Sequence, residues 1–323
     1  MAIQTPDLPT RARAGTTPDG ASGGTRPARR RRLREQLTTQ AFLVPIAVVL
    51  VVLFLVPLAE SVYYSFTDYS GSSPTRHLVG LRNYRQIFTD PSVLTGLGFT
   101  LLYAVATTLI VTVLAIPLAV ILNRRFPGRS LVRAAFFFPA VPSMAILGLV
   151  WTFVLSPLSS GVINSVLGSI FGVGPVPWLS DNTLAKVSVI VVGVWAQTGW
   201  HAVLYLAYLQ SVPRDYYEAA TIDGATPRQQ FFRITLPLLA PAMTVSQFLL
   251  LINGLRVYDL PFTLTAGGPG YDTYTITQVL VQRGIAEGDY GLGAALGVIF
   301  LIAVAAVLSL QLSVTRRLER RFR

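Results

Sequence analysis

The sequence predicts an all-α integral membrane protein with six transmembrane helices. Of its 323 residues, 52% are hydrophobic and 13% are charged, whereas about 25% of the residues of a soluble domain are charged. Six segments also contain the roughly 20 predominantly apolar residues that a membrane-spanning helix needs. These observations argue against a soluble globular domain and place most of the chain in a bilayer.

The first apolar segment, residues 41–64, follows a tail rich in Arg, Pro, Gly and Thr over residues 1–36. A tail of this composition cannot bury a core, so we predict that it is disordered. The apolar segment is too long for a secretory signal and has no small-residue cleavage site, so 37–64 is predicted as an uncleaved first transmembrane helix. The other predicted spans are 97–122, 133–155, 184–210, 238–262 and 291–314.

The arginines predict the orientation of these spans, because basic residues concentrate in cytoplasmic loops. Twenty arginines lie in the N-terminal tail, the 123–133 loop, the 211–237 loop and the basic tail 315–323. Both termini are therefore expected in the cytoplasm. The segments 65–96, 156–183 and 263–290 are expected on the outer side, and 97–314 is expected to form the membrane core after the first outer loop.

Composition also argues against several classes of function. The chain has no cysteine and two distant histidines, so we expect no metal site. Lys186 is the single lysine, and no phosphate-binding loop precedes it, so this chain is not expected to hydrolyse ATP itself. We expect no enzymatic activity and no cofactor. A net charge of +11 is compatible with nucleic-acid binding, but the arginines flank apolar segments, so no nucleic-acid partner is expected.

The cytoplasmic segment 211–237 predicts two short helices joined by a turn. The first covers 214–222 and ends before Gly224, since glycine readily adopts the left-handed conformation that ends helices. The second begins at a capping box formed by Thr226 and Gln229 and continues to about residue 235. The local pattern alone fits either a rigid elbow that faces the cytosol or an amphipathic linker that rests on lipid headgroups.

A longer motif in this segment points to a known family. Glu218-Ala219-Ala220, Gly224, Ile234 and Leu236-Pro237 resemble the EAA loop of permease subunits of binding-protein-dependent ABC importers. The resemblance implies a type I importer permease fold, with the elbow as a coupling helix docked on a separate ATPase that moves it as a rigid lever. It also implies an ATPase-coupling site, in which Glu218 and Gly224 matter most, formed by Glu218, Ala219, Ala220, Asp223 and Gly224.

Other stretches resemble the maltose- and glycerol-phosphate-type carbohydrate permeases. They include "WAQTGWHAVLYLAYLQSVPRDYYEAA", "VGLRNY", "PWLSD", "RVYDLPFTLT" and "LTAGGPG", and together they cover about residues 79–270. Two features depart from that pattern: the family often has Asn where this chain reads "GLGFT", and His201 is not a signature residue of the family.

The resemblance implies a sugar importer subunit in the bacterial plasma membrane, where it crosses the lipid several times. Its implied partners are a second, related permease in a heterodimer, two ABC ATPase subunits and an extracytoplasmic substrate-binding protein. Two other functions remain open. An importer permease for a polyamine or an anion would share the EAA loop. A secondary transporter would work without ATP, but the sequence shows neither its paired intramembrane carboxylates nor its inverted repeats.

Polar residues inside two predicted spans are candidates for the substrate pathway. Ionisable groups in a bilayer are costly and usually face a cavity or a partner. In the fifth span these candidates are Asn253, Arg256 and Asp259, and the spacing of the last two predicts a shared face and mutual neutralisation. In the fourth span they are Gln197, His201 and Tyr205, four residues apart. A structural ion pair would also explain why Arg256 and Asp259 lie in a span. Packing between helices would also explain the polar residues of the fourth span.

Overall fold

The computed structural model of the protein describes residues 43–71 and 76–319. Within those residues it contains helices and no β-strand, apart from an isolated bridge between Thr67 and Leu78. The predicted disordered tail 1–36 lies outside the described residues. The chain divides into two compact units, one ending at Leu58 and one beginning at Ala59, and each is described by itself.

The described part of the first unit belongs to an apolar helix. It comprises α2 (Leu43–Leu50), the π-helical turn η1 (Val51–Leu55) and the start of α3 (Val56–Tyr64). Together, Leu43–Tyr64 form a 22-residue candidate membrane span with a mean hydropathy of 2.7. Large apolar side chains are exposed along it, which suits contact with lipid acyl chains.

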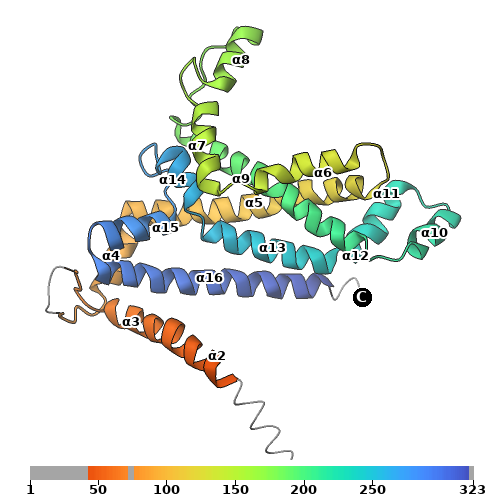
Figure 1. Ribbon diagram of the computed structural model, residues 1–323. Coiled ribbons are helices and arrows are strands. Elements are labelled where there is room, and N and C mark those ends of the chain that lie inside the picture. The colour runs from red at the N-terminus through yellow and green to blue at the C-terminus, as the bar shows by residue number, and fades with distance from the viewer. Residues whose placement is uncertain (1–42, 72–75, 320–323) are drawn as a thin grey trace, which may run out of the picture. The chain divides into compact units, whose positions relative to one another are not determined.

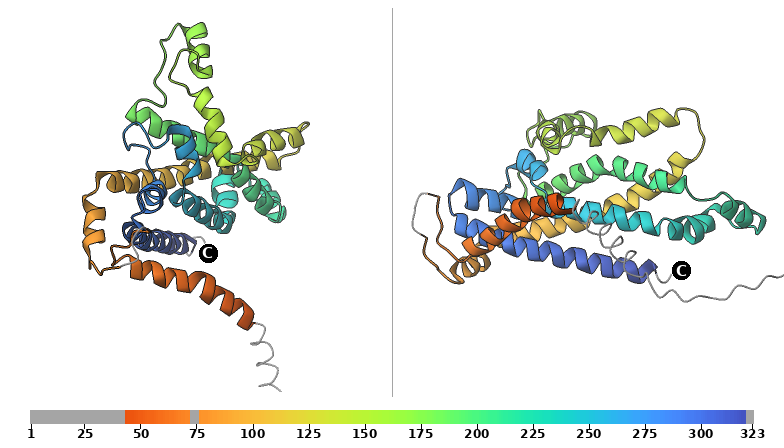
Figure 2. Two further views of the ribbon diagram at one scale, coloured as in Figure 1. Left: turned by 60° about the vertical axis from the view of Figure 1, so that its left-hand side comes forward. Right: turned by 60° about the horizontal axis from the view of Figure 1, so that its bottom comes forward.

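The second unit contains the other helices. They are α4 (Arg82–Thr89), α5 (Pro91–Asn123), α6 (Arg129–Phe137), η2 (Phe138–Ala140), α7 (Met144–Val154), α8 (Val162–Phe171), α9 (Asn182–Leu209), α10 (Asp215–Ile222), α11 (Pro227–Gln230), η3 (Phe231–Thr235), α12 (Leu236–Leu238), α13 (Ala240–Leu255), α14 (Asp259–Thr265), α15 (Ile276–Val279), η4 (Leu280–Ala286) and α16 (Tyr290–Glu319). In Figures 1 and 2, α5, α9, α13 and α16 run alongside one another.

The described residues contain four helices long and apolar enough to cross a membrane, and up to six spans if each of two bent pairs counts as one. The expected third span, 133–155, is one bent pair, with a 96° bend between α6–η2 and α7. Its bend contains Pro139 and Pro142, and proline removes a helical hydrogen bond and clashes with the preceding turn. The expected fifth span, 238–262, overlaps the other pair, in which Pro227–Leu238 and Ala240–Leu255 meet at a 66° bend beside Pro241.

The second span begins at Pro91, before the expected residue 97. Asp90 caps this helix, because its carboxylate accepts hydrogen bonds from the Ser92 backbone N–H at 2.8 Å and the Ser92 hydroxyl at 2.6 Å. It also pairs with the Arg283 guanidinium at 3.2 Å. Burial raises the pKa of this carboxyl, but the hydrogen bonds from Ser92 and the charge of Arg283 outweigh burial and leave the pKa below its ordinary value.

We expect Asp90→Asn to destabilise the protein at neutral pH by about 0.5–1 kcal/mol, because asparagine keeps the cap but loses the ion pair. A carboxyl whose folded-state pKa is lowered contributes stability above its unfolded pKa and loses it as the pH falls through the folded pKa. The difference in unfolding temperature between wild type and variant should therefore shrink as the pH falls below the ordinary Asp pKa of about 4, and disappear below the lowered folded-state pKa. Asp289→Asn is the matched control. Asp289 accepts a hydrogen bond from the Leu292 backbone N–H at the start of α16 but forms no ion pair with a described residue.

Close helix packing builds the core of the second unit. Tyr103 of α5 and Tyr205 of α9 are among its largest fully buried side chains. A Cβ atom added to Gly254 of α13 would lie 2.7 Å from the Cα atom of Ala104, so α5 and α13 approach almost backbone to backbone. Small residues of this kind allow close packing between membrane helices.

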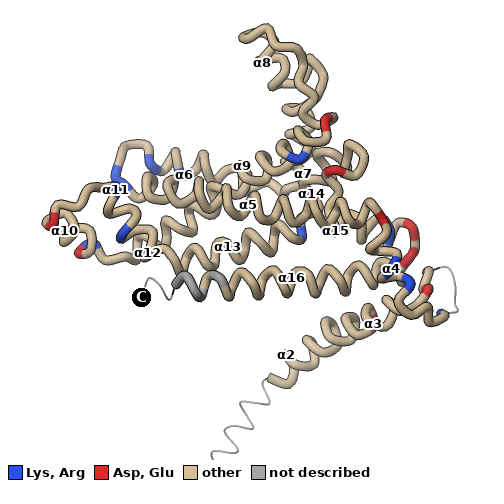
Figure 3. The backbone as a smooth tube through the Cα atoms, turned by 180° about the vertical axis from the view of Figure 1, so that it is seen from behind, with Lys and Arg blue, Asp and Glu red and all other residues tan. Residues whose placement is uncertain are grey.

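The two ends of the second unit carry different elements. The segment α10–α11 lies at the same end as the C-terminal end of α16, and α4 and α15 lie at the opposite end (Figures 1 and 3). Arginines gather around the ends of α6, α11 and α12, beside the acidic residues of α10 (Figure 3). The connections predicted to be cytoplasmic therefore meet at one end.

Candidate functional site

The 211–237 segment folds as two short helices joined at a glycine turn, as its sequence predicts. The first helix, α10, is followed by Gly224, whose φ of +76° lies in the left-handed region. The second helix begins with the predicted capping box: Thr226 Oγ1 accepts from the Gln229 backbone N–H at 3.3 Å, and Gln229 Oε1 accepts from the Thr226 backbone N–H at 2.7 Å. We call residues 215–238 the elbow.

Hydrogen bonds tie the two arms of the elbow together. The Gln230 side-chain amide donates to Thr221 Oγ1 at 3.1 Å and to the Ala225 carbonyl at 3.3 Å. The Tyr217 and Thr235 hydroxyls lie 3.2 Å apart and join α10 to η3. These contacts cross from one arm to the other and hold the two arms together.

The predicted coupling residues lie on the surface of the elbow. Glu218, Ala219, Asp223 and Gly224 are exposed, and Ala220 is half-buried. Ile222, which is not among the predicted coupling residues, is 86% exposed. The signal available in the sequence was an isoleucine inside a polar, charged segment. The exposed surface of α10 and its turn is thus acidic and partly apolar.

Four of the six predicted pathway residues line one pocket of about 290 Å³. Its walls come from α5, α7, α9 and the junction of α13 with α14. Asn253, Arg256 and Asp259 are exposed, and Gln197 is half-buried. The pocket is lined by Tyr103, Met144, Gln197, Asn253, Arg256, Val257, Tyr258, Asp259 and Leu260.

The structure corrects the prediction that Arg256 and Asp259 share one helix face. α13 ends at Leu255, and Asp259 begins the separate helix α14. Pro261 explains the break, because proline is tolerated in a first helical turn and disfavoured inside a continuous helix. None of the ion pairs between described residues joins Arg256 to Asp259. The two charges therefore reach the pocket from different elements.

The other two pathway candidates lie in the core rather than in this pocket. His201 and Tyr205 are 2% and 0% exposed, respectively. His201 Nδ1 is 2.8 Å from the hydroxyl of Ser246 on α13, so this pair joins α9 to α13. The predicted stripe on the fourth span is divided: Gln197 faces the pocket, and His201 and Tyr205 pack between helices.

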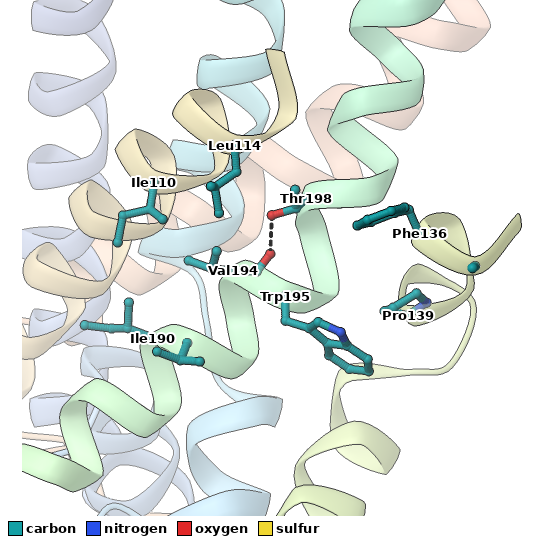
Figure 4. Close-up of a pocket in the computed structure, with 10 residues that line it drawn as sticks. Ile110, Leu114, Phe136, Pro139, Ile190, Val194, Trp195 and Thr198 are labelled. Carbon is teal, nitrogen blue, oxygen red and sulfur yellow. Dashed lines mark hydrogen bonds between the residues drawn. The ribbon is translucent and has the colours of Figure 1, made fainter. Parts of the chain in front are cut away.

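A further pocket, of about 540 Å³, is lined mostly by apolar side chains, unlike the 290 Å³ pocket. It lies among α5, α6–η2 and α9, and Ile110, Leu114, Phe136, Ile190, Val194 and Trp195 form most of its wall (Figure 4). The hydroxyl of Thr198 is directed to the Val194 carbonyl, 2.7 Å away, rather than to a ligand. This apolar surface suits acyl chains or a neighbouring helix, and it lacks the polar groups that recognise a hydrophilic solute.

The chain is similar to known proteins over most of its length. Residues 111–323 match the model of the family described as binding-protein-dependent transport system inner membrane component. The chain is 34% identical to the trehalose/maltose transport system permease protein MalF of Thermococcus litoralis, over 88% of this chain and 96% of that protein. It is 32% identical to the diacetylchitobiose uptake system permease protein NgcF of Streptomyces coelicolor, over 96% and 91% of the two chains.

The multiple sugar-binding transport system permease protein MsmF of Streptococcus mutans is also 32% identical, over 86% of this chain and 95% of that protein. Among solved structures, a chain of a bacterial alginate ABC transporter in complex with an alginate pentasaccharide-bound periplasmic protein has a similar fold. Its TM-score is 0.76, with 23% identity over 90% of this chain and 97% of that chain.

Proposed function

Because this chain belongs to the family of binding-protein-dependent transport system inner membrane components, we propose that it is the permease subunit of an ATP-driven sugar importer. Relatives similar along nearly the whole chain are named as permeases for trehalose and maltose, for multiple sugars and for diacetylchitobiose. The names of these relatives are the observation that supports sugars as the class of substrate. An importer for a polyamine or an anion has no comparable support, and the family match argues against a transporter that works without ATP.

The family implies a second permease, an ATPase and a substrate-binding protein as partners. We further propose that two related permeases form a heterodimer that works with two ATPase copies. Both termini would lie in the cytoplasm. The position of the α16 end beside the elbow supports this orientation for the C-terminal end. The arginine-rich connections at that end agree with it.

The elbow would couple ATP hydrolysis on the partner to movement of the spans. Glu218, Asp223 and Ile222 are exposed where an ATPase surface would contact α10. At the other arm, η3 and α12 lead directly into α13. Since α13 also carries Asn253 near its far end, displacement of the elbow along this path would move one wall of the 290 Å³ pocket.

That pocket would form this subunit's share of the sugar pathway. Asn253, Arg256 and Asp259 are exposed in the single chain, and exposure of such groups to lipid would be costly. A water-filled pathway shared with the second permease removes that cost. Amide and charged groups bond sugar hydroxyls, and the stacked rings of Tyr258 and Phe262, 5.2 Å apart, add an aromatic surface beside them.

The test is reconstitution of the chain with its companion permease and ATPase in liposomes, with the sugar-binding protein outside. The proposal predicts accumulation of the sugar that requires both ATP and the binding protein. Accumulation of a polyamine or an anion instead of any sugar would refute the sugar class. Uptake without the ATPase would refute the importer.

A pocket variant tests the pathway separately. We expect Asn253→Ala to lower the uptake rate at saturating binding protein about fivefold, since one neutral hydrogen bond contributes about 1 kcal/mol. Ser246→Ala is the matched control, because it loses a buried hydrogen bond to His201 without touching the pocket. Equal uptake rates for Asn253→Ala and wild type would remove Asn253 from the pathway.

A further inference from the structure

A second polar pocket lies where α5 and α9 end and the elbow begins. Its volume is about 570 Å³. Arg124 and Arg125 reach it from the end of α5, and Gln210 from the end of α9. Arg214 reaches it from just before the elbow, and Tyr217 from the start of the elbow. The pocket therefore touches two long spans of the second unit and the segment proposed to couple them to the ATPase.

The positive charge of this pocket is not neutralised within the described residues. The ion pairs between described residues involve Lys186 and Arg283, and none involves an arginine of this pocket. No carboxylate lines the pocket either. Three guanidinium groups around one cavity repel one another unless an anion lies between them, and their planar forks suit phosphate oxygens.

The position of the pocket identifies the source of the anion. The candidate spans end at Asn123 and Leu209, beside the pocket, and the ends of spans lie at the level of the lipid headgroups. Val120, Leu209 and Val212 form the apolar part of the wall, and Asn123 and Thr235 also line the pocket. Basic residues above an apolar surface match the chemistry of a phospholipid, with its phosphate above its glycerol and acyl chains.

We propose that this pocket binds the phosphate of an anionic phospholipid headgroup. A bound headgroup joins the ends of α5 and α9 to the start of the elbow and neutralises Arg124, Arg125 and Arg214. The lipid thereby stabilises the elbow in its position against the spans. This inference goes beyond the proposed transport function, because it concerns binding of lipid by the permease irrespective of the solute it carries.

The purified transporter complex in a neutral detergent provides the test. Phosphatidylglycerol is titrated in mixed micelles, and binding is followed by the shift in unfolding temperature, with phosphatidylcholine as the uncharged comparison and inorganic phosphate as the free anion. Arg124→Gln/Arg214→Gln should weaken phosphatidylglycerol binding about 30-fold, at about fivefold for each arginine. Arg228→Gln/Arg233→Gln removes the same charge from the elbow outside the pocket and should leave the affinity unchanged.

Three outcomes would overturn this assignment. Equal weakening by both double variants would show general attraction between charges rather than a site. Equal binding of phosphatidylcholine would remove the need for an anion. Stabilisation by inorganic phosphate as strong as that by phosphatidylglycerol would keep the phosphate site and reject the lipid as its source. Unfolding temperatures without lipid show whether each variant is folded.

Discussion

Replacement of Gly224 by valine should nearly abolish sugar uptake while the transmembrane helices remain inserted. Gly224 has a φ of +76°, and a β-branched side chain is strongly disfavoured in that region. A cost of about 2 kcal/mol corresponds to a roughly 30-fold smaller population of the observed turn. Because the elbow would then direct α10 away from its docking position, uptake in proteoliposomes should fall by about the same factor.

Gly224→Asn is the matched control for this prediction. No atom lies within 4 Å of a Cβ added at Gly224, so the effect of valine comes from the backbone and not from a clash. Asparagine adopts the left-handed conformation more readily than other residues with a side chain. It should therefore retain most of the uptake. Equal loss of uptake in both variants would show that the side chain, rather than the turn, disturbs the transporter.

Replacement of Gly254 by leucine should disrupt packing inside the membrane. A Cβ at this position would lie 2.7 Å from the Cα atom and 3.0 Å from the Cβ atom of Ala104, which is fully buried. Since α5 and α13 must separate to admit the side chain, we expect a loss of about 3 kcal/mol in the free energy of unfolding. The unfolding temperature in detergent should fall by about 6 °C or more.

Gly98→Leu is the control for Gly254→Leu, because it is the same change in an exposed part of α5. A Cβ at Gly98 has no atom within 4 Å, so leucine there should leave the unfolding temperature near that of wild type. A fall of the same size in both variants would mean that the cost comes from adding leucine to the chain in general. In that case, the close approach of α5 and α13 would not be what stabilises the protein.

Local chemistry explains why the elbow could be predicted from the sequence. Its turn depends on Gly224, and its second helix depends on a capping box between Thr226 and Gln229, and all of these act within a few residues. Helix ends were less predictable from hydropathy. Asp90 caps α5 before the apolar residues begin, and Asp181 similarly caps α9 through the Thr183 and Leu184 backbone N–H groups.

The grouping of pathway candidates depended on contacts between distant segments. Gln197 and His201 lie one turn apart on the same helix, yet one lines the pocket and the other bonds Ser246 of α13. Spacing along α9 cannot distinguish these positions, because the difference comes from where α13 packs. The break between Leu255 and Asp259 was also not predicted. Counting apolar residues along the segment does not register that Pro261 interrupts a helix.

The proposed coupling requires the elbow to lie on the cytoplasmic side, covered by an ATPase. The chain has no cysteine, so Ile222→Cys introduces a single thiol at an 86% exposed position of the elbow. The measurement is labelling of this thiol by a membrane-impermeant maleimide in sealed vesicles of known orientation. Ile170→Cys, at a 67% exposed position of α8, is the reference for the opposite side.

We predict that the thiol at position 222 reacts only from the cytoplasmic face, and that adding the ATPase suppresses the reaction. The thiol at position 170 should react only from the outer face and should be insensitive to the ATPase. Labelling of position 222 from the outer face, or labelling that the ATPase leaves unchanged, would contradict the proposed coupling through the elbow.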